Sequence, residues 1–321
     1  MTRDFRSHLG AALAAACITL AAVPAAAQVE LSGYWARAGD ADNGYSREPV
    51  DLLGIPVSAD GRAKALSYDI AALSATERQC QMYPPFYALT GPFGFRISSV
   101  QDPITQKLVA WKLDGWIDRD TTTIWMDGRP HPSEYAPHTH GGFTTGRWEG
   151  NTLTAVTTHA KMGDIKRHTS FSSDRAKLTY RFTRRGELMT VTGILEDPVY
   201  LAEPYVLTEV FRLDPGGSPL PLTACEPIEE LPTLHENPAL VPHYLPGQNP
   251  WVNELTQNRG IPLEATVGGP ATMYPEYRKR LKETYTPPDK CKIDCGGPPV
   301  VPAPPPAPPA PPAGQAAAPP R

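Results

Sequence analysis

Apolar and polar residues alternate along much of the chain between residues 95 and 213. This two-residue period is typical of β-strands that bury one face, and Gly, Pro or Asn separates each such segment from the next. The pattern predicts strands over residues 95–100, 107–117, 121–128, 142–150, 151–160, 177–186, 187–197 and 205–214. Gly150 and Gly186 lie in expected hairpin turns, because glycine adopts positive φ easily.

Consecutive hairpins with one buried face predict an antiparallel meander. Closure into a barrel removes the exposed edge strands of such a sheet. Residues Gly33 and Trp35, at the start of a further expected strand, are similar to the Gly-x-Trp signature of lipocalins and related calycin barrels, in which the Trp closes one end. We therefore expect a mainly β fold with a calycin-like barrel; a β-sandwich with Trp35 in its core is the alternative.

Short helical segments flank the strands. Residues 58–80 predict one helix, ending before Cys80, with an apolar face formed by Ala63, Leu66, Ile70 and Leu73. After Leu213 the chain is Pro-rich and irregular, and only residues 251–258 and 275–283 look helical. The sequence thus predicts a β-barrel domain over residues 28–215 and an irregular arm over residues 216–297 that wraps the barrel.

Both chain ends have compositions that exclude a packed core. Residues 1–27 combine basic Arg3 and Arg6, an apolar stretch and a small-residue AxA site, which predicts a signal peptide cleaved after Ala27. Residues 298–321 are almost entirely Pro and Ala, which predicts a disordered, extended tail. We expect a periplasmic or secreted protein without a transmembrane segment, whose oligomeric state the sequence does not specify.

The predicted export bears on the cysteines. Removal of Cys17 with the signal peptide leaves an even set of four in an oxidising compartment, where disulfides are the default. Three pairings are possible. We favour Cys80 with Cys225, which ties together the regions before and after the strands, and Cys291 with Cys295, which closes a small loop.

Several phrases of the chain resemble an uncharacterised family of secreted bacterial proteins. They are MDGRPHP (residues 126–132), the segment 138–161 that contains TTGRWEGNTL, EDPVYLAEP (196–204), residues 242–254, and GIPLEATVGGPATMYPEY (260–277). The resemblance covers most of the chain after residue 27 and supports the domain limits. It implies no activity, cofactor or catalytic residue.

Charge and motifs exclude some function classes. The formal net charge is −4, and no basic stripe appears that would neutralise the phosphates of a nucleic acid. The glycine-rich turns lack the strand, helix and Lys context of a phosphate-binding loop, and no GxSxG motif predicts a serine nucleophile.

The residues best suited to catalysis or metal binding cluster between Trp125 and His159. This segment contains four of the eight histidines. His138 and His140 are two residues apart, so on a strand both leave the same face, and His159 lies on a neighbouring hairpin arm. If their side chains converge, the three imidazoles offer ligands for zinc or another divalent ion.

A metal-free interpretation assigns the same region to acid–base catalysis. His138 or His159 would act as the base, and Asp127 or Glu149 would orient its ring. Two arginines, Arg129 and Arg147, would then bind a carboxylate or developing negative charge. The simpler alternative is that residues 127–130 form a turn in which Asp127 accepts backbone hydrogen bonds and Arg129 makes a structural ion pair; the turn at residues 149–151 allows the same interpretation.

The main hypothesis is that the protein binds a ligand without catalysing a reaction. Aromatic residues on the strands would line a barrel interior suited to a small apolar or aromatic ligand: Trp111, Trp116, Trp125, Tyr180 and Phe182. The alternative is that these aromatic side chains simply fill the core. We therefore expect a ligand-binding barrel with its site at residues 127–159, in which Trp111, Trp125, Arg129 and Arg147 contact the ligand; a periplasmic hydrolase or lyase is the alternative.

Overall fold

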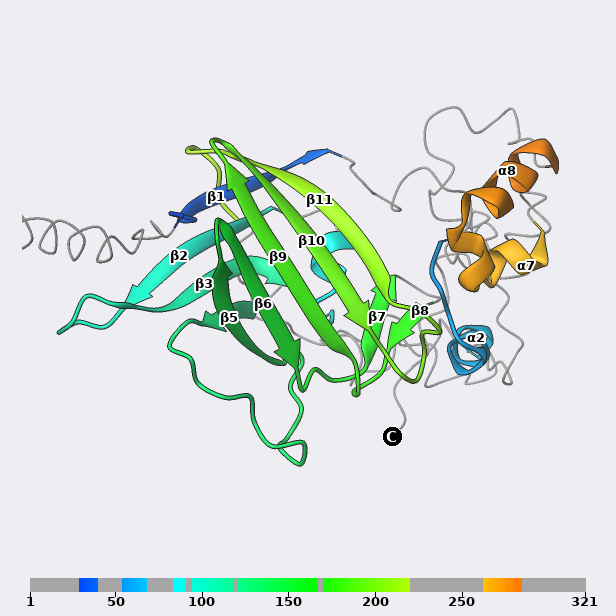
Figure 1. Ribbon diagram of the computed structural model, residues 1–321, viewed down its shortest axis with the longest axis horizontal. Coiled ribbons are helices and arrows are strands. Elements are labelled where there is room, and N and C mark those ends of the chain that lie inside the picture. Colours follow the sequence, from blue (N-terminus) through cyan, green and yellow to red (C-terminus); the bar gives the residue numbers. More distant parts are fainter. Residues whose placement is uncertain are drawn as a thin grey trace, which may run out of the picture.

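A closed nine-stranded β-barrel forms the body of the protein (Figure 1). The computed structural model describes residues 29–39, 54–67, 83–90, 94–117, 120–166, 170–219 and 262–284. The barrel strands are β1 (Gly33–Gly39), β2 (Phe95–Gln101), β3 (Leu108–Ile117), β4 (Asp120–Trp125), β5 (Phe143–Glu149), β6 (Thr152–Thr158), β9 (Lys177–Arg185), β10 (Leu188–Glu196) and β11 (Tyr205–Leu213). The prediction of a mainly β barrel is confirmed, and the sandwich alternative is not what the chain forms.

The strand order around the barrel is β1-β11-β10-β9-β6-β5-β4-β3-β2. Every neighbouring pair is antiparallel except β4 and β5, which are parallel with Ile124 opposite Thr144. A parallel pair needs a crossover connection, and the long loop of residues 126–142 provides it. The predicted all-antiparallel meander is therefore corrected at this pair.

The sequence did not predict a second, small β-sheet. A small two-stranded sheet of β7 (Gly163–Lys166) and β8 (Ser170–Ser172) lies between β6 and β9 in sequence but outside the barrel order. Strands of four and three residues carry too few alternations to stand out in a sequence. The hairpin turns are as predicted, with φ of 61° at Gly150 and 62° at Gly186.

The barrel core follows the alternation of the strands. In β10 and β11 every second residue is buried, so that one face of each strand points inward. Trp35 lies at one end of the barrel, opposite Leu213 at the end of β11 and Phe95 at the start of β2. Its side chain is fully buried, its indole Nε1 donates to the Leu31 carbonyl at 2.9 Å, and the Arg184 guanidinium lies 5.2 Å above its ring.

Helices gather at the opposite end. Here lie α2 (Ala59–Leu66), α4 (Tyr87–Thr90), α7 (Leu263–Thr266), the 3-10 helix η3 (Pro270–Met273) and α8 (Pro275–Thr284). The prediction of α8 is confirmed. Figure 1 shows α2, α7 and α8 together beyond this end of the strands. None of the helices in the described residues is long and apolar enough to cross a membrane.

The early helix is shorter than predicted and buries a different face. In α2 the buried residues are Gly61 and Ala65, whereas Ala63 is exposed. Gly61 is needed because a Cβ there would lie 2.2 Å from the Tyr200 carbonyl oxygen. The helix ends at Leu66, and the rest of the expected helix, residues 68–80, lies outside the described residues.

The described part of the C-terminal arm is tied to the segment around α2. The Arg62 guanidinium donates to the Gly268 carbonyl at 2.9 Å, and the Gly54 N–H donates to Thr272 Oγ1 at 3.0 Å. The Tyr274 hydroxyl also donates to the Glu203 carboxylate at 2.7 Å. These contacts place residues 262–284 at one end of the barrel.

Candidate functional site

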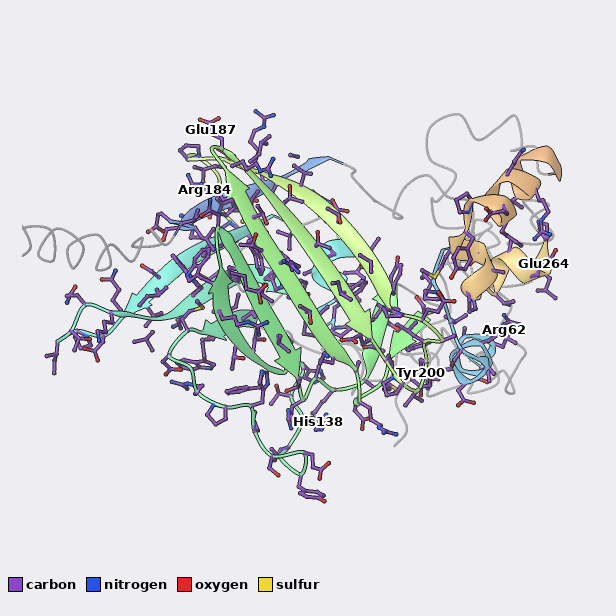
Figure 2. The ribbon with its side chains drawn as sticks, in the orientation of Figure 1. Arg62, His138, Arg184, Glu187, Tyr200 and Glu264 are labelled. Carbon is purple, nitrogen blue, oxygen red and sulfur yellow. The ribbon has the colours of Figure 1, made fainter. Side chains whose placement is uncertain are left out.

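The segment that the sequence singled out forms the crossover loop, residues 126–142, together with β5 and β6. Figure 2 labels His138 in this loop. The loop returns to the barrel wall through isolated pairing of Thr139 with Ala160. The structure brings His131, His138 and His159 together near the start of β5, whereas Arg147 and Glu149 lie toward the other end of this strand, near its turn into β6.

Two histidines belong to one hydrogen-bonded chain. The His159 Nε2 lies 2.8 Å from the Ser133 carbonyl oxygen, and because a carbonyl only accepts, this nitrogen carries the proton. In the neutral ring the other nitrogen, Nδ1, then accepts from the Thr158 hydroxyl at 2.8 Å. Thr158 Oγ1 accepts in turn from His131 Nδ1, and His131 Nε2 accepts from the Thr145 hydroxyl, both at 2.8 Å. With both rings neutral, these roles give His159 the Nε2–H tautomer and His131 the Nδ1–H tautomer.

The environment of His131 favours the same neutral state. Burial lowers the pKa of His131 below its usual value, and the neighbouring His159 lowers it further. The ring also meets Phe143 edge-on, with centroids 5.6 Å apart. This histidine anchors the crossover loop to β5 and β6.

His138 differs from both. Its Nδ1 lies 3.1 Å from the Ala160 carbonyl oxygen, so Nδ1 carries a proton, and in the neutral ring Nε2 has the lone pair. The ring centroid is 5.2 Å from that of His159. Of the two predicted catalytic histidines, His138 is the one whose basic nitrogen has no hydrogen-bond partner within the described residues.

The predicted three-histidine metal site finds no support among the described residues. Across the described ranges, no three or more His, Cys, Asp or Glu side chains are grouped so that they could hold a metal ion. His138 and His159 approach each other, but the set of His138, His140 and His159 is not such a group. Both nitrogens of His159 are already hydrogen-bonded, so a zinc ion would have to replace one of these bonds.

Asp127 and Arg129 form the turn that the sequence offered as the simpler alternative. The two side chains make a two-pronged ion pair, with the Arg129 Nη2 2.5 Å from Asp127 Oδ2, across Gly128 at φ 79°. The hydrogen bond from Arg129 is the main cause that lowers the pKa of the Asp127 carboxyl. The guanidinium also covers the Trp125 ring at 3.5 Å. Trp125 is thus on the outer wall, and its expected place inside the barrel is corrected.

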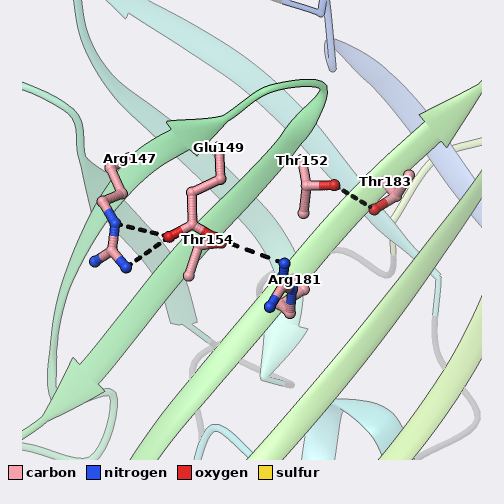
Figure 3. A network of polar contacts seen from close by, with 6 residues as sticks. All are labelled: Arg147, Glu149, Thr152, Thr154, Arg181 and Thr183. Carbon is pink, nitrogen blue, oxygen red and sulfur yellow. Dashed lines mark hydrogen bonds and ion pairs between the residues drawn. The ribbon is translucent and has the colours of Figure 1, made fainter.

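Arg147 and Glu149 are paired on the outer wall too (Figure 3). Arg147 donates to Glu149 Oε1 at 2.9 and 2.6 Å, and the Thr154 hydroxyl donates to Oε2 at 2.9 Å. Arg181 lies 3.6 Å from the same oxygen. The bond from Thr154, followed by that from Arg147, lowers the pKa of Glu149. Because the Arg147 side chain is 68% exposed, this network is a solvated surface feature.

The barrel interior contains the remaining predicted aromatic residues. Trp111, Trp116, Tyr180 and Phe182 are all buried in the core. The Trp116 ring meets Phe95 edge-on at 4.4 Å and Tyr180 at 5.2 Å. Trp116, Tyr180 and Phe182 pack on one another, as expected if they fill the core.

A chain segment that the sequence did not single out enters this interior. We call residues 83–90 the inner segment; it includes α4, and residues 84–90 are all buried. The Leu89 side chain lies over Gly193 on the inner face of β10, where a Cβ would come within 2.3 Å of Leu89 Cδ1. Phe86 packs against Tyr205 with ring centroids 5.2 Å apart. The inner segment therefore closes the end of the barrel opposite Trp35.

A buried ion pair lies at the inner end of this segment. Glu209 is on the inward face of β11 with no exposed surface, and its Oε1 is 2.5 Å from Nη2 of Arg37 on β1. The same nitrogen of Arg37 donates to the Leu89 carbonyl at 2.7 Å. Sequence reasoning missed this pair, although an acidic residue at an inward position of the β11 pattern was a signal for it.

Comparisons with known proteins give no further identification: no family model, no curated protein and no solved structure matches the chain. The signal peptide, the Pro/Ala tail, the two disulfides and the expected helix at residues 251–258 lie outside the described residues and stay predictions. The family resemblance also stays a prediction, supported by its quoted phrases.

Proposed function

We propose that this protein binds a small, mainly apolar or aromatic molecule inside its β-barrel, at the end that the inner segment occupies. The observation that carries the proposal is the Arg37–Glu209 ion pair in an interior lined mainly by aromatic and aliphatic side chains. Ligand sites combine such apolar walls with a few convergent polar groups.

An ion pair in this position is hard to explain by stability. Removing two charges from water costs several kcal/mol per ion, and apolar residues of similar size usually stabilise a core as well or better. Three further inward side chains have buried polar atoms without a hydrogen bond among the described residues: Trp111 Nε1, Trp116 Nε1 and Thr122 Oγ1. Polar groups of this kind suit a ligand that carries one or more hydrogen-bonding atoms.

A binding experiment tests the proposal. The purified protein is titrated with naphthalene, naphthoic acid and N-phenylnaphthylamine while the tryptophan emission is recorded. We expect saturable binding with one site per chain and quenching, because Trp111 and Trp116 lie in the interior. If the ion pair is the polar anchor, the acid and the amine bind at least about tenfold more tightly than the hydrocarbon, equivalent to one charge-assisted hydrogen bond.

The matched variant replaces both charges, Arg37→Met with Glu209→Leu. The two substitutions could also disturb the inner segment and so change the affinity of all three ligands alike. The ratio of affinities between ligands, measured within one variant, is unaffected by such a change. We expect the preference for polar ligands to disappear while naphthalene still binds. Absence of saturable binding of any of the three ligands refutes the proposal, and an unchanged preference in the double variant refutes the role of the ion pair.

One observation supports a second candidate function, acid–base catalysis at His138. Its Nδ1–H is fixed on a backbone carbonyl, which orients a basic Nε2, as in histidines that act as general bases. Hydrolysis of a nitrophenyl ester is the simplest assay. A rate that falls to the uncatalysed level in His138→Ala but not in His131→Gln supports catalysis, and equal rates in both variants refute it.

We also propose that the chain is exported and cleaved after Ala27, on the pattern of residues 1–27. N-terminal sequencing of the protein recovered from the periplasm should begin at Gln28. Mass analysis with and without a reductant should show two disulfides. A cytoplasmic protein that retains residues 1–27 refutes the export.

A further inference from the structure

We propose that the inner segment occupies the ligand position, and that its contacts define the ligand as a short apolar peptide or a peptide-like amide with two carbonyl acceptors. This inference rests on the proposed function and adds the ligand class and a competition between the ligand and the chain's own segment. It is argued from what the barrel wall offers to the inner segment.

The wall provides two inward donors for carbonyl groups. The Tyr180 hydroxyl on β9 donates to the Pro85 carbonyl, and Arg37 on β1 donates to the Leu89 carbonyl at 2.7 Å. Burial raises the pKa of Tyr180 well above its usual value, so that the hydroxyl keeps its proton and stays a donor. Both acceptors are main-chain carbonyl oxygens, the group that every peptide and amide presents.

The same wall provides space for two apolar side chains. Gly193 has no side chain, and Leu89 and Phe86 fill the volume above it, with Phe86 Cε2 3.4 Å from where a Cβ would stand. Phe86 also packs on Tyr205. A ligand that replaces the segment would therefore present an aromatic and a branched aliphatic group between its two carbonyls.

The inner segment has the character of an exchangeable occupant. Its helix α4 is a single turn of four residues, and one turn of helix has little stability of its own. It does not join the barrel ladder: the strand order runs without it. When it leaves, Arg37 keeps its partner Glu209, so no buried charge is left alone.

The fraction of molecules in which the inner segment fills the site determines how much the apparent ligand affinity is reduced. If the segment fills the site in about 99% of molecules, the apparent affinity for a competitor is about 100-fold below the intrinsic one. Weakening the segment removes this penalty. The affinity of the full protein for a fixed probe therefore reports on the competition.

The experiment uses N-phenylnaphthylamine as a fluorescent probe and the full-length mature protein. The segment is weakened in Phe86→Ala/Leu89→Ala, and Leu31→Ala serves as the control, because Leu31 is an equally buried leucine at the Trp35 end. We expect the double variant to bind the probe at least about tenfold more tightly than the wild type. The control should bind like the wild type. A peptide of sequence YPPFYALT, residues 83–90, should displace the probe from the double variant, and a scrambled peptide should not.

Each of the other possible results contradicts one identifiable part of the proposal. Equal probe affinities in the wild type and the double variant overturn the competition but leave the proposed function standing. Tighter binding that YPPFYALT cannot displace overturns the peptide-like ligand class. Saturable probe binding by none of the proteins overturns the proposed function itself. If circular dichroism shows that the double variant is unfolded, Tyr180→Phe replaces it, since this change removes only the hydroxyl that holds Pro85 and should also raise probe affinity.

Discussion

The contact between Gly193 and Leu89 provides a quantitative test of how the inner segment fits the barrel. Gly193→Ala places a methyl group 2.3 Å from Leu89 Cδ1 and 3.4 Å from ring atoms of Phe86 and Tyr180. Overpacking of this kind costs about 1–3 kcal/mol. Leu89→Ala alone removes a fully buried side chain and costs about 2–5 kcal/mol.

The two changes together should cost less than their sum. In the double variant the new methyl group no longer meets Leu89 and partly fills the cavity that its truncation leaves. We expect a favourable coupling energy of about 1 kcal/mol or more, within the usual range for residues in contact. Urea unfolding followed by tryptophan fluorescence yields the four free energies of the cycle.

A second cycle serves as the control. Leu31→Ala combined with Gly193→Ala joins sites at opposite ends of the barrel, and such pairs add to within about 0.3–0.5 kcal/mol. Additivity of Gly193→Ala with Leu89→Ala as well would refute the contact, and with it the placement of the segment inside the barrel.

Three further predictions concern charged and titratable groups. The pKa of His131 in the folded protein is lowered from 6.5. The stabilisation that depends on neutral His131 is therefore complete above pH 6.5 and is lost as the pH falls toward the lowered pKa. As the pH is lowered through this range, the urea midpoint of His131→Gln should fall less steeply than that of the wild type. Arg37→Met alone should cost about 3–5 kcal/mol, because it removes the Arg37 guanidinium from the buried Glu209 carboxylate, whereas Arg37→Met/Glu209→Leu should unfold near the wild-type urea concentration. Asp127→Asn and Glu149→Gln should change neither probe affinity nor the urea midpoint measurably, since both carboxylates lie in exposed pairs.

The sequence predicted the barrel well because its signal is local. The alternation in β10 is carried by consecutive residues, and turn glycines such as Gly186 mark where each strand ends. The parallel pairing of β4 with β5 is not local. It depends on how residues 126–142 cross the barrel, and no two-residue period encodes that path.

The predicted site shows the same limit at the level of side chains. The sequence located a polar cluster, but Asp127 and Arg129 satisfy each other, as do Arg147 and Glu149, so that each pair is a local surface contact. The buried pair joins β1 to β11 and could not be read from spacing. The position of Glu209 among inward apolar residues of β11 was still a usable signal, because a charge on a buried face needs a partner.

The pairing of β1 with β11 constrains the order in which the protein folds. Trp35 lies opposite Leu213, so the first barrel strand finds its second neighbour only after the last one has been synthesised. Contacts this distant in sequence form slowly, and until then β1 and β11 present open edges that other chains can pair with. The ring closes in a late step, and a shortened chain that lacks β11 should aggregate rather than form a smaller barrel.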